Sequence, residues 1–358
     1  NLPGGLALLV LTPDAQVFVS SGMPSATKDI HFRAASNTKT LTAAAILLLH
    51  ERGQLKVTDK IIDNIPGTTT PYIPETSTYA IPFKSEITIL QLLQHRAGVF
   101  DITNNAVPDT VSQDVPYKGT SFLQYMLDQD EFRTITFDTL VGAVARCAIY
   151  HNRPGEAYKY SNTGYTLLGK IIERISGKSY GQFIIDEIIT PMGMTNSSMP
   201  SAGTDQSIPA TFAPGYYYMN GETFDVTLSN LSGNVAEGNL ITTPADLAKF
   251  LRTLLRGDGV LSASTVSSIM THCVPENDNS SRSYGCGLGF INNLGYGHSG
   301  AHAGYLSQMV YVPDADISIV IFTNVWDYSN GMTSLMKQVQ NFEPIMTKAR
   351  NIALYGAK

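Results

Sequence analysis

Extended segments lie at both ends of this chain, and a long stretch of helical character separates them. Residues 6–11 and 16–21 are short β-prone runs, and the turn sequence Thr-Pro-Asp-Ala between them predicts a hairpin. Near the other end, the segments with the pattern of consecutive antiparallel strands are residues 284–292, 295–298, 306–312 and 317–324. Because strands must pair to satisfy their backbone groups, we expect both ends to build one antiparallel sheet.

The middle of the chain repeats apolar side chains every three or four residues, which predicts helices. A first helix is expected over residues 36–52, where Ala and Leu are frequent and Gly53 follows as a C-terminal cap. A later helix starts at the sequence Thr-Pro-Ala-Asp from Thr243 and ends near Arg256. Further helices are expected at residues 88–94, 122–128, 164–175 and 181–189, and again from about residue 330 onward.

These patterns predict an α/β (α+β) fold with two interleaved parts. We expect residues 1–65 and 205–358 to form the antiparallel sheet and its flanking helices, and residues 66–204 to form an inserted, mainly helical domain. Residues 66–85 contain four prolines and many Ser and Thr residues, which predicts a long surface loop.

Composition excludes several classes of function. A formal net charge of −6 argues against a nucleic-acid groove or an anionic membrane surface as partner. The longest apolar stretches, such as residues 43–49 and 317–322, are far shorter than the roughly 20 residues of a membrane-spanning helix. The three cysteines, Cys147, Cys273 and Cys286, are widely spaced, so at most one disulfide can form and no CxxC metal site exists.

Ser36 and Lys39 are the first candidate pair for chemistry, in the sequence AASNTKTLT at the start of the first predicted helix. Residues three apart share one helix face, so the hydroxyl and the amine can come within hydrogen-bond reach. The positive end of the helix dipole favours a developing negative charge at Ser36. Burial would lower the pKa of Lys39, so we expect a neutral amine that acts as base while Ser36 is the nucleophile. Alone, the pair is more typical of an ordinary helix start, so a second signal is needed.

A second candidate segment is PGEAYKYSNTGY, residues 154–165. Tyr160 and Asn162 are two positions apart, so both project to the same side of an extended loop. A phenol can relay a proton, and an amide can hold a substrate carbonyl together with a lysine ammonium. The alternative is a turn followed by an Asn cap of the next helix.

A third candidate segment is GYGHSGAHAGY, residues 295–305, on a predicted strand. His298 and Gly300 are expected on one face and Ser299 on the other. Without a side chain, Gly300 would let a ligand lie against the strand edge and pair with its backbone N–H groups.

Other residues that could suggest chemistry favour structural interpretations. His298 and His302 could share a face, but no carboxylate pattern accompanies them, so no metal site and no cofactor are expected. His95 is expected to tie down a loop, and Cys286 to be a packed side chain. The glycines of residues 285–289 (GCGLG) predict a strand that bends close to another backbone rather than a phosphate loop.

Taken in order, the three segments resemble the three motifs of the penicillin-recognising serine hydrolases, which include DD-peptidases, class C β-lactamases, esterases and D-amino-acid amidases. The motifs here are Ser36-x-x-Lys39, Tyr160-Ser161-Asn162 and His298-Ser299-Gly300, and the resemblance extends from about residue 5 to 325. Flanking segments with the same resemblance are HFRAASNTK, LLQHRAGVFDIT and YGCGLGF. A His in the third motif resembles the DD-carboxypeptidase and D-aminopeptidase branches more than the β-lactamases.

The resemblance implies a catalytic cycle through an acyl-enzyme, with the active site in the cleft between the two domains. It implies that Ser36 attacks an amide or ester, that Lys39 and Tyr160 move its proton, and that Asn162 holds the acyl side chain. It further implies that His298 tunes Tyr160 and faces the leaving group. The substrate would lie along residues 298–300, and the backbone N–H groups of Ser36 and Ala301 would form the oxyanion hole.

The resemblance implies a D-alanyl-D-alanine carboxypeptidase or another D-residue-specific peptidase that penicillins can acylate. The place after the third motif, where relatives that grip a carboxylate often carry a hydroxyl, holds Ala301, and Ser299 is the remaining hydroxyl candidate. Alternatives are an esterase, a D-amino-acid amidase or a β-lactamase of the same fold, and a non-catalytic descendant that binds peptidoglycan. The resemblance favours a secreted or periplasmic location, and from Asn1 onward the sequence shows no signal-peptide pattern.

Overall fold

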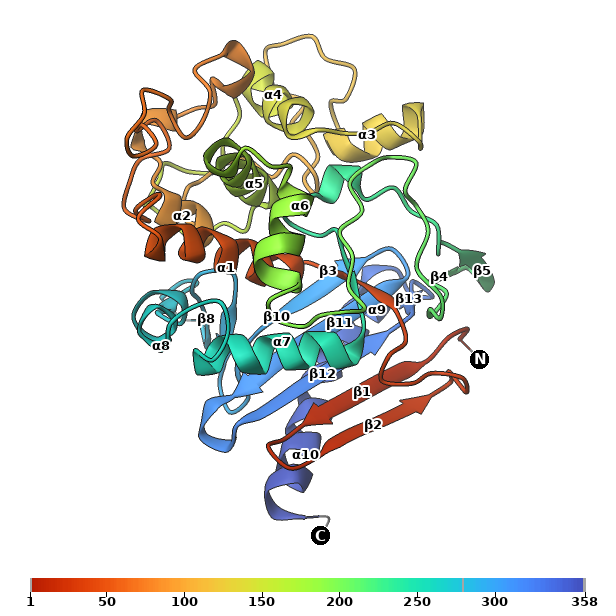
Figure 1. The fold of residues 1–358 in the computed structure, drawn as a ribbon. Helices are drawn as coiled ribbons and strands as arrows, with labels where there is room; N and C mark the ends of the chain where they lie inside the picture. The colour runs from red at the N-terminus through yellow and green to blue at the C-terminus, as the bar shows by residue number, and fades with distance from the viewer. Residues whose placement is uncertain (1, 279, 357–358) are drawn as a thin grey trace.

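The computed structural model describes residues 2–278 and 280–356. Its main feature is an eight-stranded antiparallel sheet in the order β2-β1-β12-β11-β10-β9-β8-β7 (Figure 1). The first two strands come from the start of the chain and pair with β12 from its far end, in a register that runs from Leu6 opposite Thr323 to Leu11 opposite Ser318. The predicted sheet built from both chain ends is therefore confirmed.

The strands near the end of the chain differ in detail from the sequence-based expectation. The strands of the main sheet are β1 (Leu6–Leu11), β2 (Gln16–Ser21), β7 (Val274–Pro275), β8 (Arg282–Tyr284), β9 (Gly289–Ile291), β10 (Gly295–His302), β11 (Tyr305–Val312) and β12 (Ile317–Thr323). The single strand expected over residues 284–292 is two short strands. Between them a Cβ on Gly285 would lie 2.5 Å from the Met270 carbonyl oxygen, and one on Gly287 would lie 2.6 Å from the Lys39 carbonyl oxygen. The glycine run thus bends close to other backbone, as predicted.

Helices fill the middle of the chain and flank the sheet. They are α1 (Thr38–Glu51), α2 (Ile89–Leu93), α3 (Phe122–Gln129), α4 (Phe137–Cys147), α5 (Asn162–Ser176), α6 (Tyr180–Ile184), α7 (Pro244–Arg256), α8 (Ala263–Thr265), α9 (Met332–Gln340) and α10 (Phe342–Tyr355). The chain continues from α6 into a π-helical turn at Ile185–Ile189. The sequence analysis did not predict α4.

Two hydrophobic clusters cover the two faces of the main sheet. On β12, Val320 and Phe322 belong to the large cluster that contains α7, whereas Ile319 and Ile321 belong to a smaller cluster that contains α10. This alternation is that of a strand buried on both sides. In Figure 1, α7 crosses the near face of the sheet and α10 lies on the far side.

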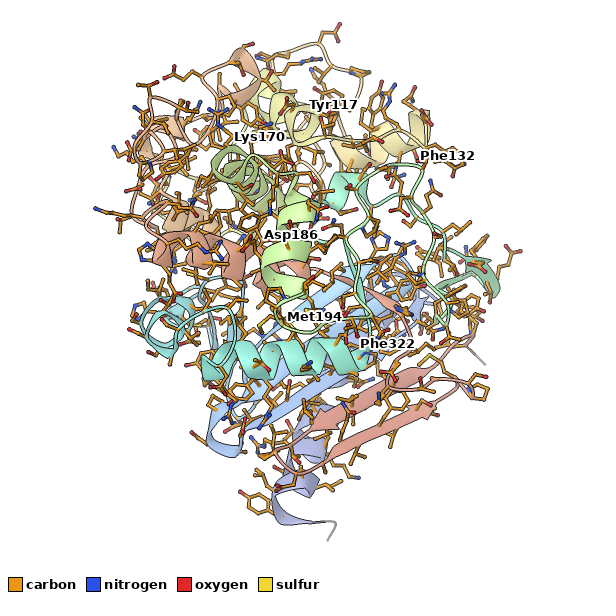
Figure 2. The ribbon with its side chains drawn as sticks, in the orientation of Figure 1. Tyr117, Phe132, Lys170, Asp186, Met194 and Phe322 are labelled. Carbon is orange, nitrogen blue, oxygen red and sulfur yellow. The ribbon has the colours of Figure 1, made fainter. Side chains whose placement is uncertain are left out.

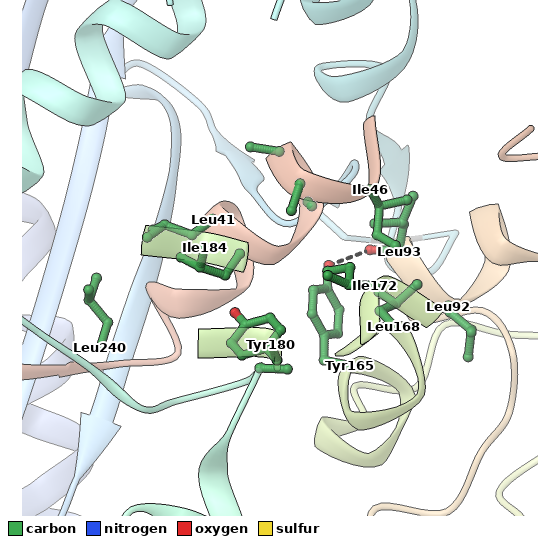
Figure 3. Packing of buried hydrophobic residues seen from close by; sticks show 14 of the residues in the cluster. Leu41, Ile46, Leu92, Leu93, Tyr165, Leu168, Ile172, Tyr180, Ile184 and Leu240 are labelled. Atoms are coloured by element: carbon green, nitrogen blue, oxygen red, sulfur yellow. Dashed lines mark hydrogen bonds between the residues drawn. The ribbon is translucent and has the colours of Figure 1, made fainter. Parts of the chain in front are cut away.

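The helices α2 to α5 gather on the side of α1 that faces away from the sheet (Figure 1). Among the side chains labelled in Figure 2, Tyr117 and Lys170 lie in this helical part and Phe322 lies on the sheet. Tyr165 of α5 packs against α1, and its hydroxyl donates to the Leu93 carbonyl at 2.8 Å (Figure 3). The large cluster includes residues of both α5 and α7, so one core joins the helical part to the sheet. The domain limits at residues 65 and 204 stay a prediction.

The loop expected over residues 66–85 is less exposed than predicted. Tyr72 and Ile73 are fully buried, and Tyr79 lies in a short 3-10 helix, Ser77–Tyr79. The two tyrosine hydroxyls find carboxylate partners in Asp59 and Asp138. A proline-rich composition indicated the absence of long elements, but it carried no signal for aromatic side chains that enter the core.

Two smaller sheets accompany the main sheet in the described part of the chain. The remaining strands are β3 (Phe32–Ala35), which pairs with β6 (Leu240–Thr242), and β4 (Tyr216–Met219), which pairs with β5 (Glu222–Asp225) and β13 (Val325–Asp327). Across residues 2–278 and 280–356, the structure contains no helix that combines the length and the apolar character needed to cross a membrane.

Candidate active site

Ser36 lies at a sharp turn between β3 and α1. The pairing of β3 with β6 shifts register between Arg33 and Ala35, and Ala35 has a left-handed backbone with φ 49°. Such a conformation is strained for a residue with a side chain and recurs at functional sites. Within residues 30–49, all of which the structure describes, Ser36 alone is partly exposed. The turn therefore presents this one hydroxyl at the surface of an otherwise buried segment.

The helix after this turn begins slightly later than predicted. Its N-cap is Asn37 and not Ser36, and the Asn37 amide donates to the Ala34 carbonyl and to the Ser307 hydroxyl, each at 2.8 Å. These two bonds fix the start of α1 against β3 and β11. Ser36 is thereby left free of a capping role while it stays next to the positive end of the helix dipole.

Lys39 is fully buried and makes three short polar contacts. Its Nζ lies 3.2 Å from Ser36 Oγ, 2.8 Å from the Glu237 main-chain oxygen and 3.1 Å from Glu237 Oε2. The same Nζ lies 4.9 Å from the centre of the Tyr160 ring. The predicted approach of the lysine to the serine is thus present in the structure.

The predicted neutral state of Lys39 is wrong for this resting structure. Burial lowers the pKa of Lys39, but the Tyr160 phenol and the Glu237 carboxylate outweigh it, so the pKa lies above its ordinary value. A buried opposite charge favours the ammonium form more than lost hydration disfavours it. Lys39 is therefore a cation that donates to Ser36, not a free amine.

The sequence analysis did not identify Glu237, the main partner of Lys39. Its side chain is 2% exposed, and its Oε1 accepts from Asn234 Nδ2 at 2.7 Å. Burial raises the pKa of the Glu237 carboxyl, and Lys39 opposes that rise. The local sequence NVAEGN carries no periodicity or motif that marks a buried acid. Only its tertiary contact with Lys39 reveals it.

Tyr160 lies half-buried in the loop before α5. Burial raises the pKa of its phenol, while the Lys39 ammonium and hydrogen bonds to Lys39 and Ser36 act in the opposite direction. The His95 ring packs against it with 4.2 Å between ring centres. His95 also accepts from the Ser161 main-chain N–H at Nδ1, 3.1 Å away. The predicted role of His95 in tying down a loop is confirmed by this bond.

Asn162 is the first residue of α5, and Ser161 is the N-cap. The Asn162 amide nitrogen donates to Thr103 Oγ1 at 2.9 Å, and Oδ1 is buried without a hydrogen-bond partner among the described residues. The sequence predicted that Asn162 could hold the Lys39 ammonium, but Glu237 binds that ammonium instead. An unpaired buried acceptor is costly, so Asn162 Oδ1 is the atom of this segment best suited to bind an N–H group of a ligand.

His298 is neutral, and both of its ring nitrogens bind protein groups. Nδ1 lies 2.6 Å from the Ser299 carbonyl, which can only accept, so Nδ1 carries the proton. Nε2 therefore accepts from the Tyr284 hydroxyl at 2.8 Å. Burial lowers the pKa of His298 to about 3. Its ring centre lies 6.3 Å from that of Tyr160.

The rest of the third motif follows the alternation of a strand. Ser299 and Ala301 are exposed, and His298 and Gly300 are buried, as predicted. The reason given for Gly300 needs correction. A Cβ there would lie 2.1 Å from the Ala34 carbonyl oxygen, so the glycine admits the protein's own backbone rather than a ligand. This close approach brings β10 against the segment that carries Ser36.

One side of β10 lacks a strand neighbour over part of its length. The pairing with β11 covers Tyr296 to His302, whereas the pairing with β9 stops at Gly297. From His298 onward, that side of β10 pairs with no other strand of the described chain. Unpaired backbone groups on such an edge can bind an extended ligand.

The remaining candidates have structural environments. Cys286 is fully buried, and burial raises the pKa of its thiol; all three cysteines are free thiols. His302 pairs with Ser229 Oγ at 2.9 Å, and burial lowers its pKa to about 3. In the part of the chain that the structure describes, no group of three or more His, Cys, Asp or Glu side chains could hold a metal ion.

Comparison with known proteins places this geometry in a family. The sequence profile of the family described as Beta-lactamase matches residues 3–336. The chain belongs to the beta-lactamase family. Its members are serine hydrolases that include penicillin-binding proteins and D-amino acid amidases, as the resemblance in the sequence implied.

Among curated relatives of this beta-lactamase family member, Penicillin-binding protein 4* of Bacillus subtilis (strain 168) is 27% identical over 328 residues, which are 87% of this chain and 64% of the relative. Protein flp of Staphylococcus aureus (strain N315) is 25% identical over 336 residues, which are 91% of this chain and 60% of the relative. The chain thus spans less than two thirds of the length of these relatives.

Solved structures have the same fold. A D-stereospecific amidohydrolase from Streptomyces sp. matches with a TM-score of 0.76 and 25% identity, over 94% of this chain and 93% of the other. A D-amino acid amidase from Ochrobactrum anthropi SV3 matches with a TM-score of 0.76 and 24% identity, over 99% of this chain and 95% of the other. These matches agree with the β-lactamase/DD-peptidase fold that the sequence predicted.

Proposed function

We propose that this beta-lactamase family member is a serine acyl-hydrolase that cleaves amide bonds at D-residues through an acyl-enzyme on Ser36. The observation that carries the proposal is the 3.2 Å contact between the partly exposed Ser36 hydroxyl and the buried Lys39 amine. A nucleophile next to a group that can exchange its proton is the arrangement that covalent acyl transfer requires. A protein that only binds a ligand has no need of a buried lysine at this place.

The other residues of the three motifs have proposed roles in the same reaction. Tyr160, whose ring centre lies 4.9 Å from Lys39 Nζ, would pass a proton to the leaving group. Asn162 would bind the acyl part of the substrate through its unpaired Oδ1. The backbone N–H groups of Ser36 and Ala301 would stabilise the oxyanion, an effect worth about 10²- to 10³-fold in rate for each donor. Water would then release the acid.

The charge of the site bears on the substrate class. A C-terminal carboxylate needs a cationic or strongly donating partner, but His298 is neutral and Lys39 is already paired with Glu237. The exposed Ser299 hydroxyl is the remaining donor of the third motif. We therefore favour a D-residue amidase or peptidase over a strict D-alanyl-D-alanine carboxypeptidase. The D-specific enzymes among the structural relatives support the same choice.

A substrate panel tests this proposal. D-amino-acid amides, D-Ala-D-Ala peptides and p-nitrophenyl esters are compared with the L-amino-acid amides as matched controls, in the wild-type protein and in Ser36→Ala. We expect turnover of the D-amides, weaker turnover of the carboxylate-bearing peptides, and loss of at least about 10³-fold in Ser36→Ala. Hydrolysis that is unchanged in Ser36→Ala would favour a non-catalytic descendant that binds peptidoglycan. Preference for D-Ala-D-Ala peptides over D-amides would instead support a D-alanyl-D-alanine carboxypeptidase.

A further inference from the structure

The Glu237 carboxylate has no role in the three motifs, yet it is the closest charged partner of Lys39. Its Oε2 lies 3.1 Å from Lys39 Nζ, and its main-chain oxygen lies 2.8 Å from the same atom. The two side chains are 0% and 2% exposed. A buried ion pair is a poor source of stability compared with apolar packing, so its presence beside a nucleophile calls for a functional explanation.

The backbone around Glu237 holds this carboxylate in place. Asn234 binds it from one side, since its amide donates to Oε1 at 2.7 Å and its carbonyl accepts from the Glu237 and Gly238 N–H groups. The preceding residue, Ala236, has a left-handed backbone with φ 71°. Ala35, which precedes Ser36, is strained in the same way. Strain of this kind persists only where the surrounding structure enforces it, and it gathers at functional sites.

We propose that Glu237 positions Lys39 during acyl transfer, accepts a proton from it and later returns that proton. This inference rests on the proposed function, since it assumes that Ser36 is the nucleophile. Glu237 does not contact the substrate in this scheme. It acts through Lys39 as a positioning residue.

The protons balance over one acylation. As Ser36 Oγ attacks the carbonyl carbon, Lys39 gives one proton to Glu237 Oε2 and takes the hydroxyl proton of Ser36. The C–N bond then breaks, and the leaving amine receives a proton from Lys39 by way of the Tyr160 hydroxyl. Glu237 returns its proton to Lys39, which restores the carboxylate and the ammonium. Deacylation repeats the cycle with water in place of Ser36.

The tyrosines and the carboxylate near Lys39 and Glu237 do not take part in the proton transfer between these two residues. Tyr160 and Tyr180 face Glu237, and burial raises the pKa of both phenols, so they are neutral. Asp101 is a nearby carboxylate that raises the pKa of Glu237 further. This acid already accepts bonds from Thr103 and from Asn104.

Two histidines face Lys39 from the other elements packed against it. Burial lowers the pKa of His95 and also that of His298, and the Lys39 charge adds to both effects. Both imidazoles are therefore neutral and do not compete for the proton of Lys39. A change at Glu237 should consequently appear as a change in the titration of Lys39.

The variant Glu237→Gln tests the inference through the pH dependence of kcat/KM for p-nitrophenyl ester hydrolysis. In the wild type, the fall of kcat/KM at low pH (the acid limb of the profile) reports protonation of Glu237. In Glu237→Gln, Lys39 must lose its proton to solvent before it can act, so the acid limb should follow the lysine and move up by more than about one pH unit. Near neutral pH the loss should be about 10²-fold, with recovery as the pH rises.

The controls separate this role from a structural one. Glu237→Asp keeps a carboxyl group and should keep the acid limb close to that of the wild type. Asp246→Asn removes another buried carboxylate, one that accepts from Asn196 and Ser197, and it should leave the limb unmoved. An equal loss of activity at every pH in Glu237→Gln would overturn the proposal, because a purely structural residue gives that result.

A measurement on the wild-type protein keeps the inference testable if Glu237→Gln does not fold or if no substrate is turned over. Carbon-13 NMR of labelled lysines, with Lys39 assigned by its absence in Lys39→Arg, reports its charge directly. An ammonium at neutral pH supports the inference, and a neutral amine contradicts it. Failure of the wild type to hydrolyse any ester or amide would instead count against the proposed function, whatever the charge of Lys39.

Discussion

The two sides of Ser36 differ in charge. On the α1 side, Lys39 and Glu237 form a buried ion pair that touches the serine hydroxyl. On the β10 side, His298 is a neutral imidazole whose nitrogens bind Tyr284 and its own strand. We therefore propose that the ion pair carries out the proton transfer and that the uncharged strand edge holds the substrate in place.

Removing the cation should have the largest effect. Lys39→Met would leave Glu237 buried and unpaired, so we expect the free energy of unfolding to fall by about 3–5 kcal/mol. Ester hydrolysis should fall by at least about 10³-fold. Chemical denaturation and initial rates measure the two losses.

The double variant Lys39→Met with Glu237→Leu sharpens this comparison. Replacing both charges by apolar side chains should restore much of the stability, because the unpaired carboxylate is gone. Activity should stay lost, because the proton carrier is gone as well. Recovery of activity together with stability would mean that the ion pair serves only the fold.

A smaller effect is expected on the β10 side from Gly300→Ala. The new methyl group would lie 2.1 Å from the Ala34 carbonyl oxygen, so β10 or the Ser36 turn must shift. Overpacking of this kind costs about 1–3 kcal/mol of unfolding free energy. Activity should fall with it, since a misplacement of about 1 Å can cost on the order of 10²-fold in rate. Gly181→Ala is the matched control, because Gly181, like Gly300, has no positive φ, and its added Cβ would lie no closer than 3.5 Å to another atom, the Met199 carbonyl oxygen. Equal effects of the two changes would argue against the close approach of β10.

Within about one pH unit below 6.5, the smallest effect is the loss of stability that the neutral His298 imidazole produces. The pKa of His298 is about 3 in the folded protein, below its ordinary value of 6.5. Below pH 6.5, His298 is therefore protonated in the unfolded chain but stays neutral in the folded chain. The free energy of unfolding consequently falls as the pH drops below about 6.5. The loss is about 1.4 kcal/mol per pH unit for such a group. Denaturation of the wild type and of His298→Gln at several acidic pH values should show a shallower slope in the variant. Equal slopes would mean that His298 is not held neutral.

The same contrast shows what the sequence could and could not predict. Local patterns were sufficient for the hairpin at residues 6–21, because its alternation and its turn lie within one short stretch. They also identified Ser36 and Lys39 as candidates, because two residues three positions apart near a helix start lie close together. Tyr160 was found because it belongs to a recognisable motif.

Local patterns could not identify residues whose role comes from a partner far away in the sequence. Glu237 lies 198 residues from Lys39 in the sequence, and nothing in its own neighbourhood indicates burial. The charge of Lys39 was mispredicted for that reason, since burial alone lowers its pKa, whereas Tyr160 and Glu237, which are distant in the sequence, together raise it. Similarly, the neutral state of His298 depends on its burial and on the charge of Lys39, and the need for Gly300 depends on the Ala34 backbone.

The most direct test of the account is the site of covalent modification. The wild-type protein is incubated with labelled penicillin, and intact mass followed by peptide mapping locates the adduct. Because a β-lactam presents a strained amide to the nucleophile, we expect one acyl group per chain, attached to Ser36 and absent in Ser36→Ala. A chain that stays unmodified at millimolar drug, or that carries the acyl group on another residue, would contradict the account.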